Sequence, residues 1–544
     1  MAKITAIEVE NFQTIGNRTV LPIRDLTLLF GPNGAGKSII FDALDFLRLL
    51  VSGNWGEDCS DLKNLLKKWS RNVNTQNPSN LLGVGIQIYI DEHWANDEIP
   101  YSNIQTWDNL RLHALNPEGD YAEQFLNRQL YFFIQFENIE PSYHRWCIRE
   151  LTITLDTEPI LEFKHDNPDH WISAYLYQKD WMSFEAIEKV DKKNTEIKLE
   201  KGILSSKIMT EVGFEIEAAS WFRLMRDGYH PLQEHEFKTL FRQVIDFFKA
   251  VIGEALSDAH LVRASRTVPT RRESISLVPG ETSYVESGEH RRGYRLEWSP
   301  LLHTIEQDIN RQDVHWNQMF KAVASAKSSD QDGEIKDWDE QNTLERVNGF
   351  LRDELFIDNG YQLTAEVLCI TNLDSLDDVS YSNPSYYAKM IRLFLKDNHQ
   401  RQLEFEDVGS GIGYVLPVLA SLAHDDISLI QQPELHLHPA LQSNLGDVVV
   451  KSAENKQYFR AFTVIETHSE HLLLRVLRLI RTSPSRNNDV LSPITYDRVS
   501  ILYFEPRTDG ETIVKRLRLA PDGQLIDRWP GGFFNERFKD IFGE

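Results

Sequence analysis

The sequence predicts an α/β protein in which helices flank a mixed sheet and a phosphate-binding loop follows one of its strands. A short apolar run at residues 26–30 leads into a glycine-rich loop and then into a segment of helical periodicity. Much later in the chain, the apolar runs at 427–430 and 462–465 each end in a cluster of polar side chains. Open α/β sheets bind ligands at such strand ends, so the sequence predicts one site built from both ends of the chain.

The glycine-rich loop is Gly31-Pro-Asn-Gly-Ala-Gly-Lys-Ser38, which matches the pattern GxxxxGK[ST] between a strand and a helix. Its glycines let backbone N–H groups turn inward around a phosphate, and the start of the next helix adds a positive dipole. Lys37 would reach the β- and γ-phosphates, and Ser38 would bind Mg²⁺. We therefore expect ATP and Mg²⁺ as cofactors, with the remaining phosphate contacts from the loop residues Asn33, Gly34, Ala35 and Gly36.

Strand patterns surround this loop in the first part of the chain. Residues 4–12 and 20–23 alternate as two antiparallel strands would, and we expect them to form a flap on the nucleotide side of the sheet. The runs at 84–90, 130–136 and 151–155 are also typical of strands. We assign residues 1–164 to the N-terminal part of a split head.

The second part of the head is predicted at residues 401–544. Residues 406–422, EDVGSGIGYVLPVLASL, combine a glycine loop with an apolar helix, and such a loop can present N–H groups to phosphate. QQPELHLHP at 431–439 and ETHS at 466–469 follow the two strand candidates. Residues 165–400, helical at 215–257, are predicted to form an α+β insertion between the two parts.

The order GPNGAGKS, VGSGIGY, QQPELHLHP and ETHSEH resembles the ABC-type P-loop ATPase heads of the RecF, SMC and OLD group. Within that group, DRWPGGFFNE at 527–536, PELHLHPALQ and THSEHLLLRVLRLIR resemble the Septu-type (PtuA-like) ATPases of retron-associated antiphage defence. The resemblance covers about residues 1–50 and 400–544. The middle matches only loosely, at 261–271.

The resemblance implies specific roles for several residues. Residues 31–38 would be the Walker A loop, and Ser410 and Gly411 the ABC signature that caps the γ-phosphate of the opposite subunit. His468 would be the switch histidine that senses this phosphate. Such sites close only between two heads, so the resemblance implies a homodimer with nucleotide between the subunits.

The same resemblance implies a role in antiphage defence. The chain would be a regulatory ATPase that controls a separate HNH endonuclease and, in retrons, acts with a reverse transcriptase and its branched RNA–DNA product. Only 76 residues follow His468 (544 − 468), which we expect to be too few for the nuclease domain of OLD enzymes. A RecF-like DNA-repair ATPase and a nucleotide sensor without turnover are the alternative hypotheses.

Two amides stand where relatives of this kind carry acids. Gln431 occupies the position of the acidic residue that helps hold Mg²⁺ through water, and Gln432 that of the glutamate that activates the attacking water. An amide can orient a water but cannot accept its proton, and it stabilises Mg²⁺ less. Three hypotheses follow: a slow natural ATPase, a stand-in base such as Glu434, or a carboxylate-to-amide substitution that traps the ATP state.

Histidines and arginines suggest two further kinds of site. The histidines at 436, 438, 468 and 471 lie among acids, so a zinc or manganese hydrolase is an alternative, although the ATPase interpretation accounts for both histidine clusters. Residues 261–296 contain seven arginines against four glutamates. We consider these arginines candidate contacts to nucleotide or nucleic-acid phosphate, the alternative being a solvated loop; the first four are Arg263, Arg266, Arg271 and Arg272.

Composition restricts the function classes. The 544 residues include 58 Lys and Arg against 82 Asp and Glu, a formal net charge of −24, which excludes a uniformly basic nucleic-acid binder. The three cysteines are far apart, which argues against a disulfide framework and a cysteine zinc site. No apolar run approaches the ~18 residues of a membrane span, and the first residues lack the apolar core of a secretory signal. We expect a cytoplasmic location.

Overall fold

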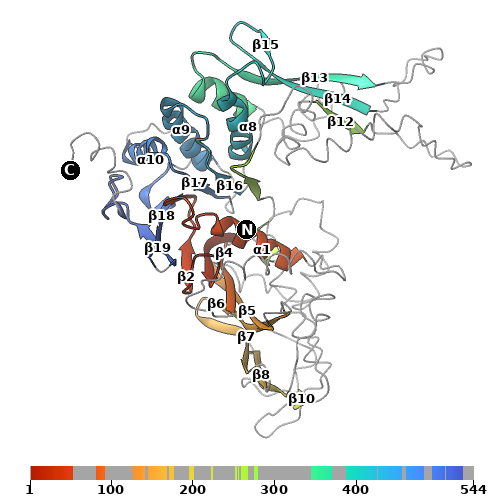
Figure 1. Cartoon of the computed structure of the whole chain (residues 1–544), viewed down its shortest axis with the longest axis vertical. Helices are drawn as coiled ribbons and strands as arrows, with labels where there is room; N and C mark the ends of the chain where they lie inside the picture. Colours follow the sequence, from red (N-terminus) through yellow and green to blue (C-terminus); the bar gives the residue numbers. More distant parts are fainter. Residues whose placement is uncertain are drawn as a thin grey trace, which may run out of the picture.

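A computed structural model gives the fold (Figure 1). Arg271, Arg272 and most of the helical segment expected at 215–257 lie outside the described residues. The described residues are 2–52, 81–91, 127–140, 145–167, 171–176, 195–200, 222–223, 251–253, 255–256, 259–266, 275–279, 345–370, 388–424, 427–455, 461–482, 493–508 and 510–530.

A six-stranded sheet forms the centre of the structure, with the strand order β11-β16-β17-β3-β18-β19. The first five strands run parallel, and β19 pairs antiparallel with β18. Segments from both ends of the chain therefore meet in one mixed sheet, which confirms the predicted α/β fold class. The strands are β3 (Leu26–Phe30), β11 (His260–Val262), β16 (Ser428–Gln431), β17 (Thr463–Glu466), β18 (Val499–Pro506) and β19 (Thr512–Leu517).

Both faces of the central strands are covered, which explains why β3, β16 and β17 are mostly apolar and buried. Alternate residues of β3 enter different cores: Leu29 packs on the side of α1 (Ile39–Ser52), and Leu28 packs on the opposite side. Three helices cover that opposite side (Figure 1): α8 (Ser410–Ala423), α9 (Pro439–Asn455) and α10 (Glu470–Thr482).

A nine-stranded antiparallel sheet lies beyond α1, in the order β10-β9-β8-β7-β6-β5-β4-β1-β2. The antiparallel pairing of β1 with β2 confirms the predicted strand pair, and β4, β5 and β6 join it in the same sheet as expected. Helix α1 packs on β1 and β4. The strands are β1 (Ala2–Glu10), β2 (Thr19–Pro22), β4 (Leu81–Ile90), β5 (Arg128–Glu140), β6 (Arg145–Leu155), β7 (Glu158–Asn167), β8 (Trp171–Leu176), β9 (Thr195–Glu200) and β10 (Phe222–Arg223).

A third sheet projects outward from the side of the central sheet that α8, α9 and α10 cover (Figure 1). It contains β12 (Ile275–Pro279), β14 (Ala388–Lys396) and β13 (Gln362–Ile370), with β15 (Gln402–Leu403) paired to β14. The segment 165–400 thus supplies most of this sheet but also β11, an edge strand of the central sheet, and the boundary drawn after residue 164 falls inside β7. None of the helices described is long and apolar enough to cross a membrane.

Asp25 connects distant parts of the chain just before β3. Its carboxylate accepts hydrogen bonds from Lys3 in β1 and from Arg498, the residue just before β18. Its backbone oxygen accepts the Thr463 N–H at 2.8 Å. Although burial raises the pKa of Asp25, the charges and hydrogen bonds of Lys3 and Arg498 outweigh it and lower this pKa.

We expect Asp25→Ala to lower the free energy of unfolding by about 2 kcal/mol at pH 7, between the values for exposed and fully buried ion pairs. Because the folded-state pKa lies below the unfolded value of about 3.9, this stabilisation is present above that pH and is lost as the pH falls through the folded-state pKa. Urea unfolding at pH 7 and at about pH 3 measures both effects. Asp353→Ala, which removes an exposed partner of Arg352, is the control and should change stability by less than about 0.5 kcal/mol. A loss of stability that did not shrink at low pH would contradict the prediction.

Candidate functional site

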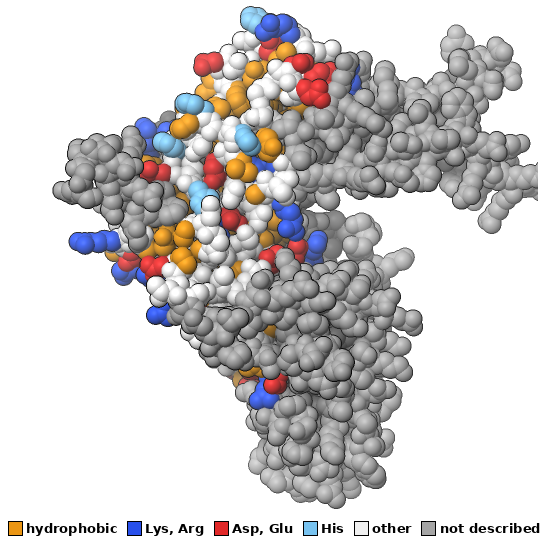
Figure 2. All heavy atoms as spheres, in the orientation of Figure 1, with side chains coloured by type: hydrophobic (Ala, Val, Ile, Leu, Met, Phe, Trp, Pro, Cys, Tyr) orange, Lys and Arg blue, Asp and Glu red, His pale blue; other side chains and the backbone are white. Residues whose placement is uncertain are grey.

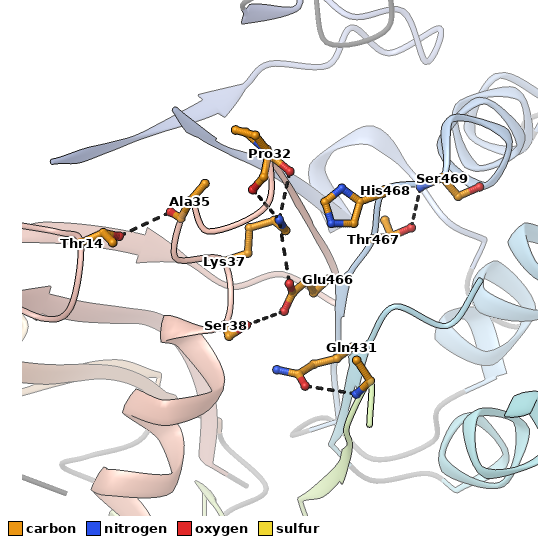
Figure 3. Close-up of polar contacts among 12 residues, drawn as sticks. Thr14, Pro32, Ala35, Lys37, Ser38, Gln431, Glu466, Thr467, His468 and Ser469 are labelled. Carbon is orange, nitrogen blue, oxygen red and sulfur yellow. Dashed lines mark hydrogen bonds and ion pairs between the residues drawn. The ribbon is translucent and has the colours of Figure 1, made fainter. Parts of the chain in front are cut away.

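The glycine-rich loop connects the buried end of β3 to α1 (Figure 3). Gly31, Gly34 and Gly36 have φ angles of 147°, 77° and 81°, which other residues rarely adopt. A side chain at Gly31 would meet the Phe504 carbonyl oxygen at 2.5 Å. Asn33 and Gly34 are exposed, so the turn of the loop is open to a ligand.

Two glycines of the loop provide a matched test of its packing. A Cβ at Gly36 would lie 2.2 Å from Thr14 Oγ1 and 2.7 Å from Ile39 Cδ1, whereas a Cβ at Gly34 would meet nothing within 4 Å. We expect Gly34→Ala to cost about 1 kcal/mol from its positive φ alone, and Gly36→Ala about 3 kcal/mol because overpacking is added. Urea unfolding of the nucleotide-free protein measures both. Equal losses would show that the close packing around Gly36 is unimportant.

Lys37 is almost fully buried and folds back onto its own loop (Figure 3). Its Nζ donates to the carbonyl oxygens of Gly31 at 3.0 Å and Pro32 at 2.9 Å, and it lies 4.0 Å from Glu466 Oε1. Burial lowers the pKa of Lys37, while the negative charges of Glu466 and Glu434 oppose this effect. A phosphate in the loop would offer the ammonium group a charged acceptor, which makes a stronger hydrogen bond than these neutral carbonyls.

Glu466 contacts the last residue of the loop from the end of β17. Its Oε2 accepts a hydrogen bond from Ser38 Oγ at 2.9 Å (Figure 3). Burial raises the pKa of Glu466, and the Ser38 hydrogen bond and the Lys37 charge oppose this shift. The sequence prediction did not select Glu466, although it is the first residue of ETHSEH and directly follows the strand predicted at 462–465, because the acid was expected after the strand at 427–430.

The end of β16 carries the two amides. Gln431 Oε1 accepts the Ala264 N–H at 3.3 Å, and Ala264 follows β11, the strand on the side of β16 away from β17 and β3. The oxygen of Gln431 is therefore engaged by the segment after β11, whereas the Ser38 hydroxyl, with which it was predicted to share Mg²⁺, is engaged by Glu466. Gln432 has a φ of 45°, and its N–H donates to the Glu466 carbonyl at 2.7 Å.

Glu434 holds the loop that follows β17. One carboxylate oxygen accepts the Thr467 hydroxyl at 2.8 Å, and the other accepts the His468 N–H at 2.7 Å. Burial raises the pKa of Glu434, and these hydrogen bonds oppose it. Burial also lowers the pKa of His468, and the Lys37 charge lowers it further.

Arg266 is a structural residue rather than a nucleic-acid contact, so that part of the prediction is wrong. Its side chain is 2% exposed, and its guanidinium donates to four backbone oxygens. These are the oxygens of Tyr414 at 2.7 Å, Arg263 at 3.1 Å, Gln431 at 3.0 Å and Gln432 at 2.9 Å.

Arg263 does reach solvent. Its side chain is 55% exposed and lies 3.5 Å from Asp45 of α1. Among the described residues in Figure 2, lysines and arginines are scattered over the visible face and form no continuous basic patch. A nucleic-acid contact through Arg263 stays a prediction.

The signature residues begin α8. Ser410 is exposed, and a side chain at Gly411 would lie 2.7 Å from the His436 carbonyl oxygen. The His436 ring packs on Tyr414 of the same helix, with the centroids 4.3 Å apart. Helix α8 packs on α9, β11 and β16.

The zinc or manganese hydrolase finds no support in the described part of the chain. His436 packs against α8, and His438 Nδ1 accepts the Ala440 N–H at 3.3 Å at the start of α9. Within the ranges given above, no three His, Cys, Asp or Glu side chains are grouped to hold a metal ion.

Three family models match separate parts of the chain. A family described as "AAA domain" matches residues 6–64, and one described as "AAA domain, putative AbiEii toxin, Type IV TA system" matches 317–475. A third, "Protein of unknown function (DUF3696)", matches 494–542. That last segment contains Trp529, whose ring lies edge-on to Phe30 with the centroids 5.4 Å apart, at the end of β3.

Known proteins with similar sequence are much longer than the matched segments. Structural maintenance of chromosomes protein 1 is 44% identical over 48 residues in Schizosaccharomyces pombe and 46% identical over 62 residues in Arabidopsis thaliana. These matches span 9% and 11% of this chain but only 4% and 5% of the relatives.

Solved structures of SMC heads also align with the chain. An SMC head bound to the C-winged helix domain of ScpA aligns with a TM-score of 0.38 and 12% identity, covering 95% of this chain and 98% of that one. The SMC head domain from Thermotoga maritima aligns with a TM-score of 0.33 and 8% identity, covering 95% and 100%.

The family matches agree with the geometry of the site. Residues 6–64 supply β3, the glycine-rich loop and α1, and residues 317–475 supply α8, β16 and β17. Two family models described as AAA domains thus match the segments that supply the two sides of the site, one near each end of the chain.

Proposed function

We propose that the chain binds Mg²⁺ and ATP at the loop 31–38 and hydrolyses ATP slowly, as the cytoplasmic regulatory subunit of a bacterial antiphage defence system. The observation that carries the nucleotide site is the position of Lys37 and Ser38. Both polar side chains meet Glu466 at the carboxyl ends of the parallel strands, where α/β sheets bind ligands. The oxygen groups of Ser38 and Glu466 suit Mg²⁺, which would neutralise phosphate charge when bound.

The site is proposed to close in a homodimer. Ser410 is exposed at the N-terminus of α8, and a Cβ at the preceding Gly409 would meet nothing within 4 Å. These residues are free to contact a phosphate bound by a second head, as the signature resemblance implies. Backbone N–H groups at a helix start favour such an anion.

Residues beyond the loop would act on the attacking water. Gln432 would orient it through its amide oxygen, and His468 would sense the γ-phosphate from the loop after β17. Glu434 is engaged by Thr467 and the His468 N–H, so its proposed contribution is to position His468 unless those hydrogen bonds open.

The defence role rests on the family description that includes an AbiEii toxin and on the Septu-type resemblance of the closing segment. The proposed partner is a separate HNH endonuclease and, in a retron, a reverse transcriptase with its RNA–DNA product. A nucleotide sensor without turnover is the second candidate, because Gln431 and Gln432 lack the carboxylates of the usual site.

Nucleotide binding tests the first part of this proposal. We expect the purified protein to bind a fluorescent ATP analogue, and Lys37→Ala to weaken binding at least about tenfold because the buried ammonium group is lost. Lys451→Ala, which removes an exposed lysine on α9, is the matched control. Undiminished binding by Lys37→Ala would overturn the proposed site.

Co-purification from the native operon tests the partner. An HNH protein retained with the chain, alone or with a reverse transcriptase and nucleic acid, supports the defence role. Retention of recombination proteins instead would favour a DNA-repair ATPase.

A further inference from the structure

Glu466 is a buried carboxylate in direct contact with the P-loop. Its side chain accepts from Ser38 Oγ at 2.9 Å through one oxygen and approaches Lys37 Nζ at 4.0 Å through the other (Figure 3). Glu466 is only 6% exposed. A buried carboxylate is costly unless it is paired, and here both partners belong to the loop.

The strand register explains why Glu466 reaches Ser38. Leu29 of β3 pairs with Glu466 of β17, and Glu466 pairs with Gln431 of β16. Leu29 packs in the core on the α1 side of the sheet, and side chains aligned across parallel strands share a face. Glu466 therefore lies about 4.8 Å from the P-loop strand, whereas Gln431 lies one strand further away, about 9.6 Å from it.

The chemistry of the two side chains also favours Glu466 over Gln431 as the ligand of Mg²⁺. Gln431 is neutral, and its oxygen accepts the Ala264 N–H at 3.3 Å. Glu466 supplies a charged oxygen to the hydroxyl group that P-loops use to bind Mg²⁺. Mg²⁺ prefers carboxylate oxygens and keeps several of its waters, which such a carboxylate can accept.

We propose that Glu466 is the carboxylate of the Mg²⁺ site in this protein, supplied by β17 in place of an acid at position 431 of β16. The inference rests on the proposed nucleotide site and deepens it, because it assigns the metal-binding role to a different strand. It also means that the amide at 431 does not by itself deprive the site of a carboxylate.

A purely structural role is the alternative explanation. Glu466 could serve only to neutralise Lys37 and hold the loop, in which case its loss would weaken nucleotide binding with or without metal. The two explanations differ in the dependence of binding on Mg²⁺.

The experiment compares the affinity for an N-methylanthraniloyl derivative of ATP in Mg²⁺ and in EDTA. We expect Glu466→Gln to reduce the gain in affinity caused by Mg²⁺ about tenfold, while affinity in EDTA stays within about twofold or improves, because a negative charge near the phosphates is removed. A similar loss of affinity in both buffers, or an unchanged Mg²⁺ gain, would overturn the proposal. If the unmodified protein bound no nucleotide in either buffer, the proposed function itself would fail.

Two further variants keep the result interpretable. Glu454→Gln removes another buried glutamate, at the end of α9, and should leave the Mg²⁺ gain unchanged. Glu466→Asp keeps the charge but withdraws it by one methylene, so its gain in affinity from Mg²⁺ should lie between those of Glu466→Gln and the unmodified protein. If Glu466→Gln does not fold, Glu466→Asp takes its place, and an unchanged Mg²⁺ gain would again overturn the proposal. Mn²⁺ in place of Mg²⁺ gives an independent readout, because the EPR spectrum of the protein–nucleotide complex should lose its immobilised component in Glu466→Gln.

Discussion

Replacing Gln432 with glutamate is expected to raise the rate of phosphate release by on the order of 10², the lower range of what a general base contributes. The backbone of Gln432 is held on both sides, by its N–H to the Glu466 carbonyl at 2.7 Å and by its carbonyl from Arg266 at 2.9 Å. The backbone of Gln432 is therefore fixed directly after β16. Its neighbour Glu466 contacts Ser38 of the P-loop. A carboxylate there can take the proton of an attacking water, which an amide cannot.

The measurement is phosphate release at saturating Mg²⁺ and ATP. Gln400→Glu is a matched control, because Gln400 also has a positive φ, 63°, and lies exposed in the turn between β14 and β15. An unchanged rate in Gln432→Glu, with normal nucleotide binding, would show that this amide does not limit hydrolysis. Gln431→Glu should gain much less, because its carboxylate would lie beside Glu466 and like charges at that spacing oppose ionisation.

The strands and helices of the site were predictable because their signals are local. The apolar run at 26–30 coincides with β3, and its residues enter two cores alternately because the strand is covered on both faces. The runs at 427–430 and 462–465 lie within one residue of β16 and β17. The glycines at 31, 34 and 36 also predicted the loop, and each of them adopts a positive φ in the structure.

The positions of Glu466 and Arg266 were not predictable in this way. Which of two strand ends contacts Ser38 depends on the order and register of β3, β17 and β16, and neighbouring letters of the sequence do not encode either. The number of arginines near residue 266 indicates a local positive charge. Whether one of these arginines faces solvent or binds buried carbonyl groups depends on its burial, which the sequence does not show. The carbonyl oxygens that Arg266 binds include one 148 residues away in sequence and two others 165 and 166 residues away.

Replacing Arg266 with methionine is expected to lower the free energy of unfolding by about 4 kcal/mol, within the range for breaking a buried charged network. The side chain joins the segment after β11, helix α8 and the end of β16 through four hydrogen bonds to backbone oxygens. Without the guanidinium these buried acceptors lose their charged donor, and unsatisfied buried groups are costly. Lysine should rescue little, because its single ammonium group cannot match the planar fork.

Urea unfolding of Arg266→Met against Arg263→Met measures this loss. Arg263 is exposed and its pairing with Asp45 is a surface contact, so its replacement should cost less than about 1 kcal/mol. Equal losses would contradict the structural role of Arg266.

Arg266 should also control the position of residue 432 relative to the bound nucleotide. Arg266 fixes the carbonyl groups of Gln431 and Gln432, whereas the P-loop belongs to a separate segment after β3. In conditions where Arg266→Met stays folded, we therefore expect nucleotide affinity within about threefold of the unmodified protein, since no loop contact is removed. The double variant Arg266→Met, Gln432→Glu should lose most of the gain in phosphate release of Gln432→Glu alone, because the carboxylate is no longer held in place. Full retention of that gain would show that the end of β16 is positioned without Arg266.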